Sequence, residues 1–461
     1  MSVACTNGNA SIVETLLKAG ANANTAMPEG ETALMTAART GKADVVRALV
    51  AAGASVNAKE SWRNQTALMW AASENHAAVA KALIDAGADV KARSNGGFTA
   101  LLFGVRAGSL DAVKALVNAG GDVNDTIQLA ERAPMARGAP PGGAGRGAAP
   151  AARGGQAAST GGEAAASADR RQIEQLVQVF NTGLRGRSGP GGTNALVLAL
   201  TNAHFELAAW LLEHGADAGA SGQGWTPLHQ IAWTRRPPIQ HGLPPAVETG
   251  NMSSLELAEM LLQYGADPNA RMTREPADGA RSVLNRIGST PFLQAAKLAD
   301  VPYMRLLVEY GADPSIATEE GATPLMAAAG VGIWQVGESA GTNDEAFEAV
   351  RLSYELGNNV NAVDVNGDTA LHGAAHRGSN DIVKFLAEKG ARLDIPNKLG
   401  WTPWIIADGV FYPNTYNRRL DTAQLLLTLG ADPRAGKRRP QDVPPSEEQR
   451  QKAAGASNQQ P

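Results

Sequence analysis

The residues with the greatest potential for chemistry are seven histidines and a single cysteine. His372 and His376 are four residues apart, a spacing that on a helix can bring two imidazoles to one metal ion. No acidic residue lies between them to act as a general base, and no third ligand is evident, although zinc-type sites use roughly three or four ligands. A structural role is therefore favoured for both histidines, and the sequence predicts no metal site.

Three other features have equally simple interpretations. Cys5 lies at a small-residue position and is expected to be a buried small hydrophobe rather than a nucleophile. The Gly-Gly-Ala-Gly run at 142–145 lacks the preceding strand, the following helix and the Lys-Ser/Thr pair of a phosphate loop. Carboxylates are spread over many turns without pairing. The sequence thus predicts no catalytic residue and no cofactor, and we expect a protein that is not an enzyme.

The composition argues against several functional classes. The chain of 461 residues has 41 Lys and Arg against 45 Asp and Glu, a net charge of -4, which is unlike the basic excess of a dedicated nucleic-acid binder. One cysteine excludes an internal disulfide framework and a multi-cysteine metal site. No apolar run reaches the length of about 18 residues that a membrane span requires.

A repeated segment of about 33 residues dominates the chain. Matching threonines are 34 residues apart between Thr32 and Thr66, and 33 apart between Thr66 and Thr99. Such a regular period is the strongest indication of architecture in the sequence. Ten copies can be placed, and they end near Gly20, Gly53, Gly87, Gly120, Gly215, Gly265, Gly311, Gly357, Gly390 and Gly430.

Each part of the repeat has a physical role. Threonine caps the N-terminus of a first helix, and proline at the next position suits its first turn. Leucine and paired alanines form a narrow apolar stripe that lets neighbouring helices approach closely. A Val-x-x-Leu-Leu pattern forms the apolar face of a second helix, and Gly-Ala-Asp/Asn then turns the chain into a β-turn finger. Because one copy cannot bury its apolar face alone, the copies must stack into a solenoid.

The sequence resembles the ankyrin-repeat family. The resemblance covers most of residues 1–434 and is most specific at 224–229 (GWTPLH), 321–325 (GATPL) and 400–403 (GWTP). It implies an all-α solenoid of stacked helix-turn-helix units with β-turn fingers, used as a protein-binding surface, and it implies no reaction. His372 occupies the family's usual histidine position, where the imidazole helps to tie adjacent fingers.

The first copy is incomplete. Aligning Gly8 with Gly41 places Met1 on Leu34, so the threonine and the finger of this copy are missing. A start further upstream is favoured over a half-repeat cap, because terminal repeats normally keep a complete helix pair with a polar outer face. Localisation therefore has two alternatives: cytoplasmic as written, or exported or periplasmic if the true start lies upstream.

Composition divides the chain into four segments. Residues 1–125 and 191–434 hold the repeats. Between them, residues 126–190 include a stretch of 36 in which 27 are Ala, Gly or Pro, which offers too little apolar surface to become ordered. A short helix is expected near 169–184, where apolar residues recur at helical spacing. The tail 435–461 is also expected to be disordered.

Three copies are lengthened between their two helices. The interval from the cap threonine to the final glycine is 21 residues in the standard copy, but 39, 34 and 28 in the copies that begin at Thr226, Thr323 and Thr402. In an ankyrin stack these loops would emerge along one edge, whereas a fourth insertion near 272–288 falls in a finger. Neutral drift is one explanation, since loops lengthen at little entropic cost. A partner-binding role for their aromatic residues and aromatic packing as local core are the alternatives.

Candidate partner-binding residues are the aromatic and basic side chains at positions that differ between copies, together with the lengthened loops. Trp and Arg dominate interface hot spots. Trp70 and Phe103 fall where leucine is usual and are instead expected in the core. The predicted partner-binding set is Trp62, Arg63, Phe98, Arg106, Trp225, Trp233, Trp334, His376, Arg377, Trp401, Phe411, Tyr412 and Tyr416.

These observations predict a non-catalytic scaffold that binds a partner protein through its concave face, fingers and aromatic loops. A rigid groove loses little entropy on binding. Residues 191–434 are expected to carry the main specificity, because six of the eight tryptophans lie there. The alternative is an accessory or regulatory subunit of an enzyme on a separate chain or of a domain lost upstream. We expect a monomer with no cofactor, no nucleic-acid partner and no membrane span.

Overall fold

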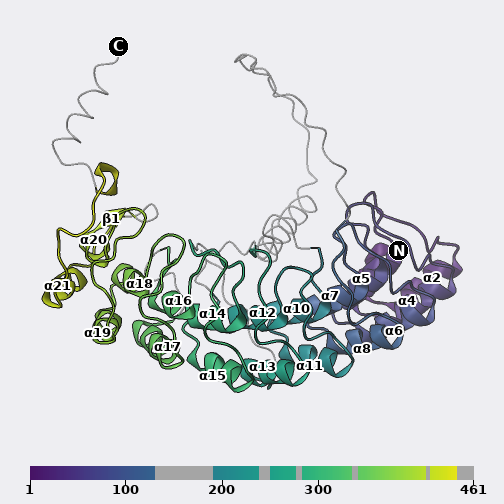
Figure 1. The fold of residues 1–461 in the computed structure, drawn as a ribbon. Helices are drawn as coiled ribbons and strands as arrows, with labels where there is room; N and C mark the ends of the chain where they lie inside the picture. The colour runs from purple at the N-terminus through teal and green to yellow at the C-terminus, as the bar shows by residue number, and fades with distance from the viewer. Residues whose placement is uncertain (130–190, 238–249, 277–282, 335–340, 412–415, 444–461) are drawn as a thin grey trace, which may run out of the picture.

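The computed structural model describes residues 1–129, 191–237, 250–276, 283–334, 341–411 and 416–443. Its helices form a curved stack with the first and last repeats at opposite ends (Figure 1). The helix expected near 169–184 lies outside the described residues. No helix of the described part is long and apolar enough to cross a bilayer.

Ten helix pairs follow one another along the described residues, and we number them copies 1–10. The first helices of the pairs are α1 (Ser2–Asn7), α3 (Ala33–Thr40), α5 (Ala67–Ser73), α7 (Ala100–Ala107), α10 (Ala195–Thr201), α12 (Pro227–Arg235), α14 (Pro291–Lys297), α16 (Pro324–Ala329), α18 (Ala370–Arg377) and α20 (Pro403–Asp408). The second helices are α2 (Ala10–Lys18), α4 (Ala43–Ala51), α6 (Ala77–Asp85), α8 (Leu110–Asn118), α11 (Phe205–Glu213), α13 (Ser254–Gln263), α15 (Val301–Glu309), α17 (Asn343–Glu355), α19 (Asn380–Glu388) and α21 (Leu420–Thr428).

Two short elements complete the described chain. Strands β1 (Val410–Phe411) and β2 (Tyr416–Asn417) pair antiparallel between α20 and α21. A 3-10 helix, η1 (Pro440–Asp442), follows the last finger. The all-α solenoid predicted from the repeat is confirmed.

The threonine that opens a copy caps its first helix. The hydroxyl of Thr32 accepts a hydrogen bond from the Met35 N–H at 3.3 Å, and such a cap stabilises a helix by about 1 kcal/mol. Proline at the next position begins α12, α14, α16 and α20, where its missing N–H would have no helical partner. Equivalent cap contacts are made by Thr66, Thr99, Thr290, Thr323 and Thr402.

Stacking of the copies forms the core. The first helices line the concave side and the second helices the convex side (Figure 1), with α3 against α5 and α5 against α7. Alanines on these first helices, such as Ala37 and Ala71, are completely buried. Their small side chains let neighbouring helices approach closely, while leucines of the second helices, such as Leu49 of α4 and Leu83 of α6, fill the space toward the first helices.

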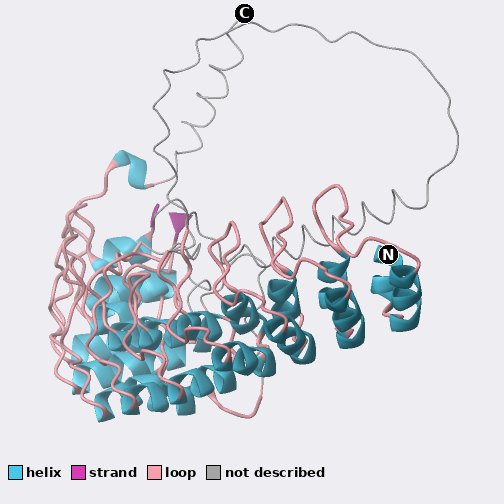
Figure 2. Ribbon diagram, turned by 90° about the vertical axis from the view of Figure 1, so that its right-hand side faces the viewer, coloured by secondary structure: helices cyan, strands magenta, loops and turns pink. Residues whose placement is uncertain are grey.

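Asparagine side chains join successive copies at the base of the fingers. The Asn24 amide donates to the Gly53 carbonyl at 3.0 Å and accepts from the Ser55 N–H at 2.7 Å. Because each amide satisfies two backbone groups of the next copy, it fixes the spacing of the fingers, which stand in a row (Figure 2). The same paired contact is made by Asn57, Asn124, Asn269 and Asn361.

Copies 4 and 5 stack directly on each other, although residues 130–190 separate them in the sequence. The Asn124 amide donates to the Gly215 carbonyl at 2.9 Å, and the Ile127 N–H donates to the Thr193 carbonyl at 2.9 Å. Residues 126–129, which the sequence placed in the insertion, therefore belong to a finger. The reason is that Ile127 is buried in the core of the stack.

Residues 435–443 were expected to begin a disordered tail, and that expectation is wrong for these nine residues. The Lys437 N–H donates to the Gly400 carbonyl at 2.7 Å, as the Lys398 N–H does to the Asn366 carbonyl one finger earlier. Gly436 has φ 78, close to the φ 83 of Gly400. A backbone hydrogen bond to the preceding finger is thus also made after copy 10, and the Trp401 indole N–H donates to Asp442 of η1, which holds η1 against that copy.

The described ends of two lengthened loops lie along one edge, as expected. Arg236, from the loop of copy 6, pairs with Glu345 at the start of the second helix of copy 8, with 2.7 Å between Nη2 and Oε1. Gly341, from the loop of copy 8, lies against Arg236 and Ala299. These contacts run across copy 7, so the loops are neighbours in space.

Candidate functional site

In copies that have a cap threonine, three positions are considered on the concave side: the residue before this threonine and the fourth and seventh residues after it. In copies 2–4 these positions hold an aromatic and basic surface. The Arg39 guanidinium lies 5.4 Å from the Trp70 ring centroid, and that of Arg106 lies 5.2 Å from Phe98 and 5.1 Å from Phe103. All except Phe103 are half-buried and keep part of their surface in solvent.

Trp70 was expected in the core, but it lies half-buried beneath Arg39. The sequence assigned it by analogy with leucine, and an indole is too large to be covered completely at that position. Phe103 is buried as expected. We call Arg39, Trp70, Phe98 and Arg106 the N-terminal aromatic surface.

The most exposed tryptophan among the described residues is Trp62, which lies at the fingertip of copy 3. Trp62 is 65% exposed, and the Arg63 guanidinium lies 4.1 Å from its ring. The buried Glu60 carboxylate accepts hydrogen bonds from the backbone N–H groups of Trp62 at 2.7 Å, Arg63 at 2.9 Å and Gln65 at 2.9 Å. One carboxylate therefore holds the whole turn, and the indole projects from a rigid base.

The same finger is also fixed from the next copy. Asn95 donates from its backbone N–H to the Arg63 carbonyl at 2.8 Å and from its side chain to the Trp62 carbonyl at 3.1 Å. Neither Glu60 nor Asn95 was identified from the sequence. Glutamate and asparagine are common on fingers, and nothing in their type or spacing distinguishes these two before the turn is folded.

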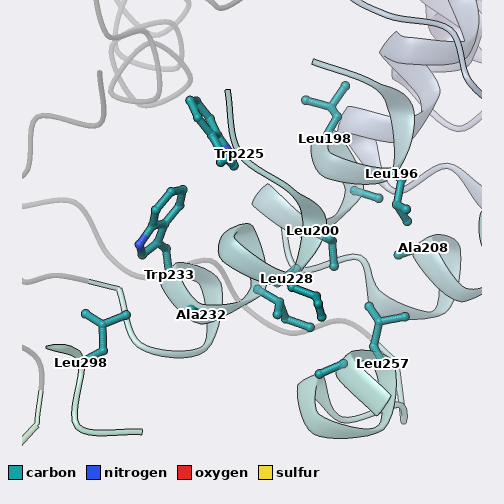
Figure 3. Packing of buried hydrophobic residues seen from close by; sticks show 14 of the residues in the cluster. Leu196, Leu198, Leu200, Ala208, Trp225, Leu228, Ala232, Trp233, Leu257 and Leu298 are labelled. Carbon is teal, nitrogen blue, oxygen red and sulfur yellow. The ribbon is translucent and has the colours of Figure 1, made fainter. Parts of the chain in front are cut away.

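In copies 6 and 7 the corresponding positions are covered. Trp225 and Trp233 are only 8% and 9% exposed, and their ring centroids are 5.7 Å apart (Figure 3). The Trp225 indole N–H donates to Gln230 at 3.2 Å, and that of Trp233 donates to Gln294 at 3.0 Å. Both indoles belong to the core with their polar atoms satisfied, which contradicts their prediction as surface anchors.

The finger insertion near 272–288 supplies part of the cover. The Arg286 guanidinium lies 5.6 Å from the Trp233 ring and pairs with Glu275, with 2.7 Å between Nε and Oε2. The Val283 N–H donates to the Gly332 carbonyl at 3.1 Å, so this finger reaches as far as copy 8. The insertion therefore packs on the concave side of its own stack.

Copy 10 is covered by the segment that follows the last finger. Trp401 is 2% exposed, and its indole N–H donates to the Asp442 carboxylate at 2.7 Å. Arg439 lies 5.6 Å from the Trp401 ring and pairs with Asp442, with 2.8 Å between Nη2 and Oδ1. Trp401 is thus also core rather than a surface anchor.

The histidines of copy 9 have structural roles. The Thr369 N–H donates to His372 Nδ1 at 3.0 Å, and Nε2 of the same ring lies 3.1 Å from the Trp401 carbonyl, so the imidazole joins two fingers as expected. Burial lowers the pKa of His372 to about 4. His229 makes the same contacts in copy 6, and burial lowers its pKa to about 4.

His376 and Arg377 are 5% and 3% exposed, which contradicts their prediction as contact residues on the surface. His376 is hydrogen-bonded to the backbone of Ile333 and Trp334. With His372, it lines a cavity of about 20 Å³, enough for roughly one water molecule. No cluster of three or more His, Cys, Asp or Glu suited to a metal occurs in the described part of the chain.

The remaining predicted residues lie in the lengthened loops. Trp334, Phe411 and Tyr416 are half-buried. The rings of Phe411 and Tyr416 face each other across the hairpin, with centroids 5.3 Å apart. Tyr412 lies outside the described residues.

Comparisons with known proteins agree with this architecture. Family models described as ankyrin repeats match residues 1–60, 59–127, 339–436 and 196–239, and a model of a single ankyrin repeat matches 223–273. The repeats recognised in this way extend from the first helix pair to the last.

Curated relatives share parts of the sequence. The human ankyrin repeat and SOCS box protein 16 is 31% identical over 215 residues, which are 46% of this chain and 40% of that protein. Serine/threonine-protein kinase 12 of Arabidopsis thaliana is 33% identical over 89 residues, 19% of this chain and 18% of that protein. Start control protein cdc10 of Schizosaccharomyces pombe is 34% identical over 93 residues, 20% and 12%.

This chain spans less than half the length of each of these relatives. The same repeating unit is nevertheless found in the family models, in the ten described helix pairs and in the row of fingers. The chain belongs to the ankyrin-repeat family, whose repeats form protein–protein interaction domains.

Proposed function

We propose that this chain is a non-catalytic scaffold that binds a partner protein through the N-terminal aromatic surface and the Trp62 fingertip. The observation that carries the proposal is the contrast in exposure along one face of the stack. Trp62 is 65% exposed and Trp70 is half-buried, whereas Trp225, Trp233 and Trp401 are 9% exposed or less.

The chemistry of this surface suits protein recognition. Trp and Arg are the residues most enriched in interface hot spots, because they combine a large apolar area with polar contacts. Arg39 and Arg106 already lie against aromatic rings, so their guanidinium groups lose little rotational freedom when a partner binds. Arg39 also lies 3.5 Å from Glu31, which holds the side chain in place.

The fingertip supports the proposal independently. Glu60 and Asn95 fix the backbone on both sides of Trp62, so an exposed indole is held at small further entropic cost. An indole that is 65% exposed buries little apolar area and contributes little to the stability of the fold. Contact with a partner would bury this apolar area.

The test compares three baits in affinity capture from the native lysate, followed by mass spectrometry. The baits are the wild-type chain, a double variant with Trp62→Ala and Trp70→Ala, and the control variant Trp210→Ala, whose indole stacks on His214 in the second-helix layer. We expect one set of proteins to be recovered with the wild type and the control, and to be lost with the double variant.

Circular dichroism of the three baits checks that each is folded. Recovery of the same proteins at the same abundance with all three baits would contradict the proposal, because the aromatic surface would then be dispensable. A loss with Trp210→Ala alone would place the binding face on the convex side instead.

The second candidate function is an accessory or regulatory subunit of an enzyme on a separate chain. The similarity to a serine/threonine-protein kinase over 89 residues is the observation that favours it. If the captured partner is an enzyme, its rate should change when the purified wild-type chain is added, and it should not change with the double variant.

A further inference from the structure

Two arginines of the described residues are buried, with exposed fractions of 5% for Arg286 and 3% for Arg377. A guanidinium group keeps its charge at any physiological pH, so a buried one needs a counter-ion and hydrogen-bond acceptors. Arg286 has both in Glu275, which accepts from its Nε at 2.7 Å. Arg286 also donates to the Pro276 carbonyl at 3.4 Å.

Arg235, whose side chain is 13% exposed, is supplied in the same way. Its Nε and Nη2 donate to the two oxygens of Asp300 at 2.7 and 3.1 Å, and Nη1 donates to the Ser254 hydroxyl at 2.7 Å. Arg286 and Arg235 therefore each have a carboxylate partner, whereas no carboxylate pairs with Arg377 among the described residues.

Nε and Nη2 of Arg377 are buried and have no hydrogen-bond partner in the described part of the chain. No carboxylate pairs with it there, and burial lowers its pKa to about 10. Arg377 is the last residue of α18, where the helix carbonyls supply only about half a unit of negative charge. That partial charge cannot replace a counter-ion.

The surroundings of Arg377 are basic. Arg419 lies over Gly378 and donates from Nε to the His376 carbonyl at 3.4 Å. Burial is the main cause of the low pKa of His376. The positive charge of Arg419 and, to a smaller extent, that of Arg377 lower the pKa further, so both guanidinium groups lie near this ring. Arg419 is half-buried, so the cluster can be reached from solvent on its side.

Two more arginines of copy 10 and the segment after it share one carboxylate, that of Asp408. Arg438 pairs with Asp408 at 2.5 Å, and Arg418 lies 3.6 Å from the same carboxylate. Asp408 is thus already neutralised, which leaves the charges of Arg377 and Arg419 uncompensated among the described residues.

We propose that Arg377 and Arg419 bind an oxyanion supplied from outside the chain, the carboxylate or phosphate group of a ligand, at the loop edge of copies 8–10. Guanidinium groups recognise both kinds of oxyanion through paired N–H donors. The site lies at the other end of the stack from the N-terminal aromatic surface, and it does not depend on the function proposed for that surface.

The test is thermal unfolding of the full chain at pH 7.5 in sodium chloride, sodium acetate or sodium phosphate at equal ionic strength. We expect the midpoint of wild type to rise in at least one oxyanion relative to chloride, and to saturate with concentration. Acetate and phosphate distinguish the two ligand classes. A response to acetate alone assigns a carboxylate, and a response to phosphate alone assigns a phosphate group.

Phosphate also stabilises proteins without binding to a specific site. Variants are therefore needed to distinguish binding at Arg377 and Arg419 from this general effect. In Arg377→Met the saturable rise should disappear, and the midpoint in chloride should match or exceed that of wild type because an uncompensated buried charge is gone. Arg419→Gln should weaken anion binding about tenfold, since it removes a charged donor. Arg434→Met, which alters an arginine that is 89% exposed, should behave as wild type.

Three results would overturn the proposal. One is a wild-type midpoint that shows no saturable difference between chloride and either oxyanion. Another is an equal saturable rise in Arg377→Met and wild type, because the anion would then bind elsewhere. The third is a lower midpoint of Arg377→Met than of wild type in chloride, since it would show that Arg377 stabilises the fold without a bound anion.

Discussion

Copies 2–4 and copies 6–10 use the same positions of the repeat in opposite ways. In copies 2–4, Arg39 and Arg106 lie over Trp70 and Phe98, and these side chains keep part of their surface in water. In copies 6–10, the equivalent tryptophans are covered by chain segments that leave the repeat and return to it.

The covering groups have a common form. Arg286 with Glu275 lies over Trp233, and Arg439 with Asp442 lies over Trp401. In each case an arginine stacks on the indole and a carboxylate neutralises it. The C-terminal half thus provides for itself the contacts that the N-terminal half leaves available, and exposed aromatic area rather than tryptophan content distinguishes the open surface from the core.

Lowering the pH should produce the largest difference in stability between the two halves. His229, His372 and His376 have pKa values of about 4, well below the ordinary 6.5, chiefly because they are buried. The unfolded chain takes up these protons near pH 6.5 and the folded chain only near pH 4. Stability is therefore present above pH 6.5 and is lost as the pH falls toward 4. The loss between pH 7 and 5 should be about 2 kcal/mol for each histidine.

Hydrogen exchange measured by mass spectrometry at pH 7 and 5, corrected for intrinsic rates, checks this. Protection should fall in copies 6 and 9 and stay unchanged in copies 2–4, where the one histidine, His76, is only half-buried. Burial raises the pKa of Asp364 and Asp368 above the ordinary value of 3.8. Their protonation opposes the effect of the histidines on stability, but it begins from a lower pKa. Equal loss of protection along the whole stack would show that the histidines do not set the acid sensitivity.

Removing a covered indole should cost more than removing an open one. Trp233→Ala deletes a ring that contacts Trp225 and Arg286, and its free energy of unfolding should fall by about 3–5 kcal/mol. Trp70→Ala removes a half-exposed ring, and the loss should be about 1–2 kcal/mol. Urea unfolding of the two variants measures both, and a larger loss for Trp70→Ala would reverse the comparison.

The Asp442 carboxylate of the covering segment should contribute less to the free energy of unfolding than a covered indole does. Asp442→Ala deprives the Trp401 indole N–H and the Arg439 guanidinium of their acceptor, and we expect a loss of about 1–3 kcal/mol in urea unfolding. Asp432→Ala, at a half-exposed carboxylate of the preceding finger, is the control. Equal small effects would mean that residues 435–443 contribute little to covering copy 10.

The exposed fingertip should have the smallest effect on stability. Trp62→Ala should change the free energy of unfolding by no more than about 0.5 kcal/mol, since its indole is largely in solvent. Partner binding should weaken by about 2 kcal/mol or more if it is a hot spot. Isothermal titration with the captured partner and urea unfolding of the same variant separate the two effects. A destabilised variant with unchanged affinity would make Trp62 part of the fold.

The fold was predictable from the sequence because its determinants are local and repeated. A threonine such as Thr32 caps a helix whatever lies elsewhere, and a glycine such as Gly41 at φ 75 ends it within the same copy. The structural role of His372 was predictable for the same reason. Its partners, Thr369 and the Trp401 carbonyl, occupy fixed places in one repeat and the next.

The open aromatic surface proposed for partner binding was predictable only in part. Residue type identified Trp62, Arg63, Phe98 and Arg106, which remain exposed or half-buried, but it also selected tryptophans that proved to be covered. The sequence treated all of them alike, because a finger position looks the same whether or not another segment lies on it.

The amino-acid order alone therefore determined the stack: its period, its caps and the faces that each copy must hide, because those forces act within a copy or between adjacent ones. Only the tertiary structure decided which part of the concave side stays open. That outcome depends on where Arg286 and Asp442 arrive after their segments turn back onto the helices. Such contacts arise from three-dimensional proximity, which no spacing along the chain encodes.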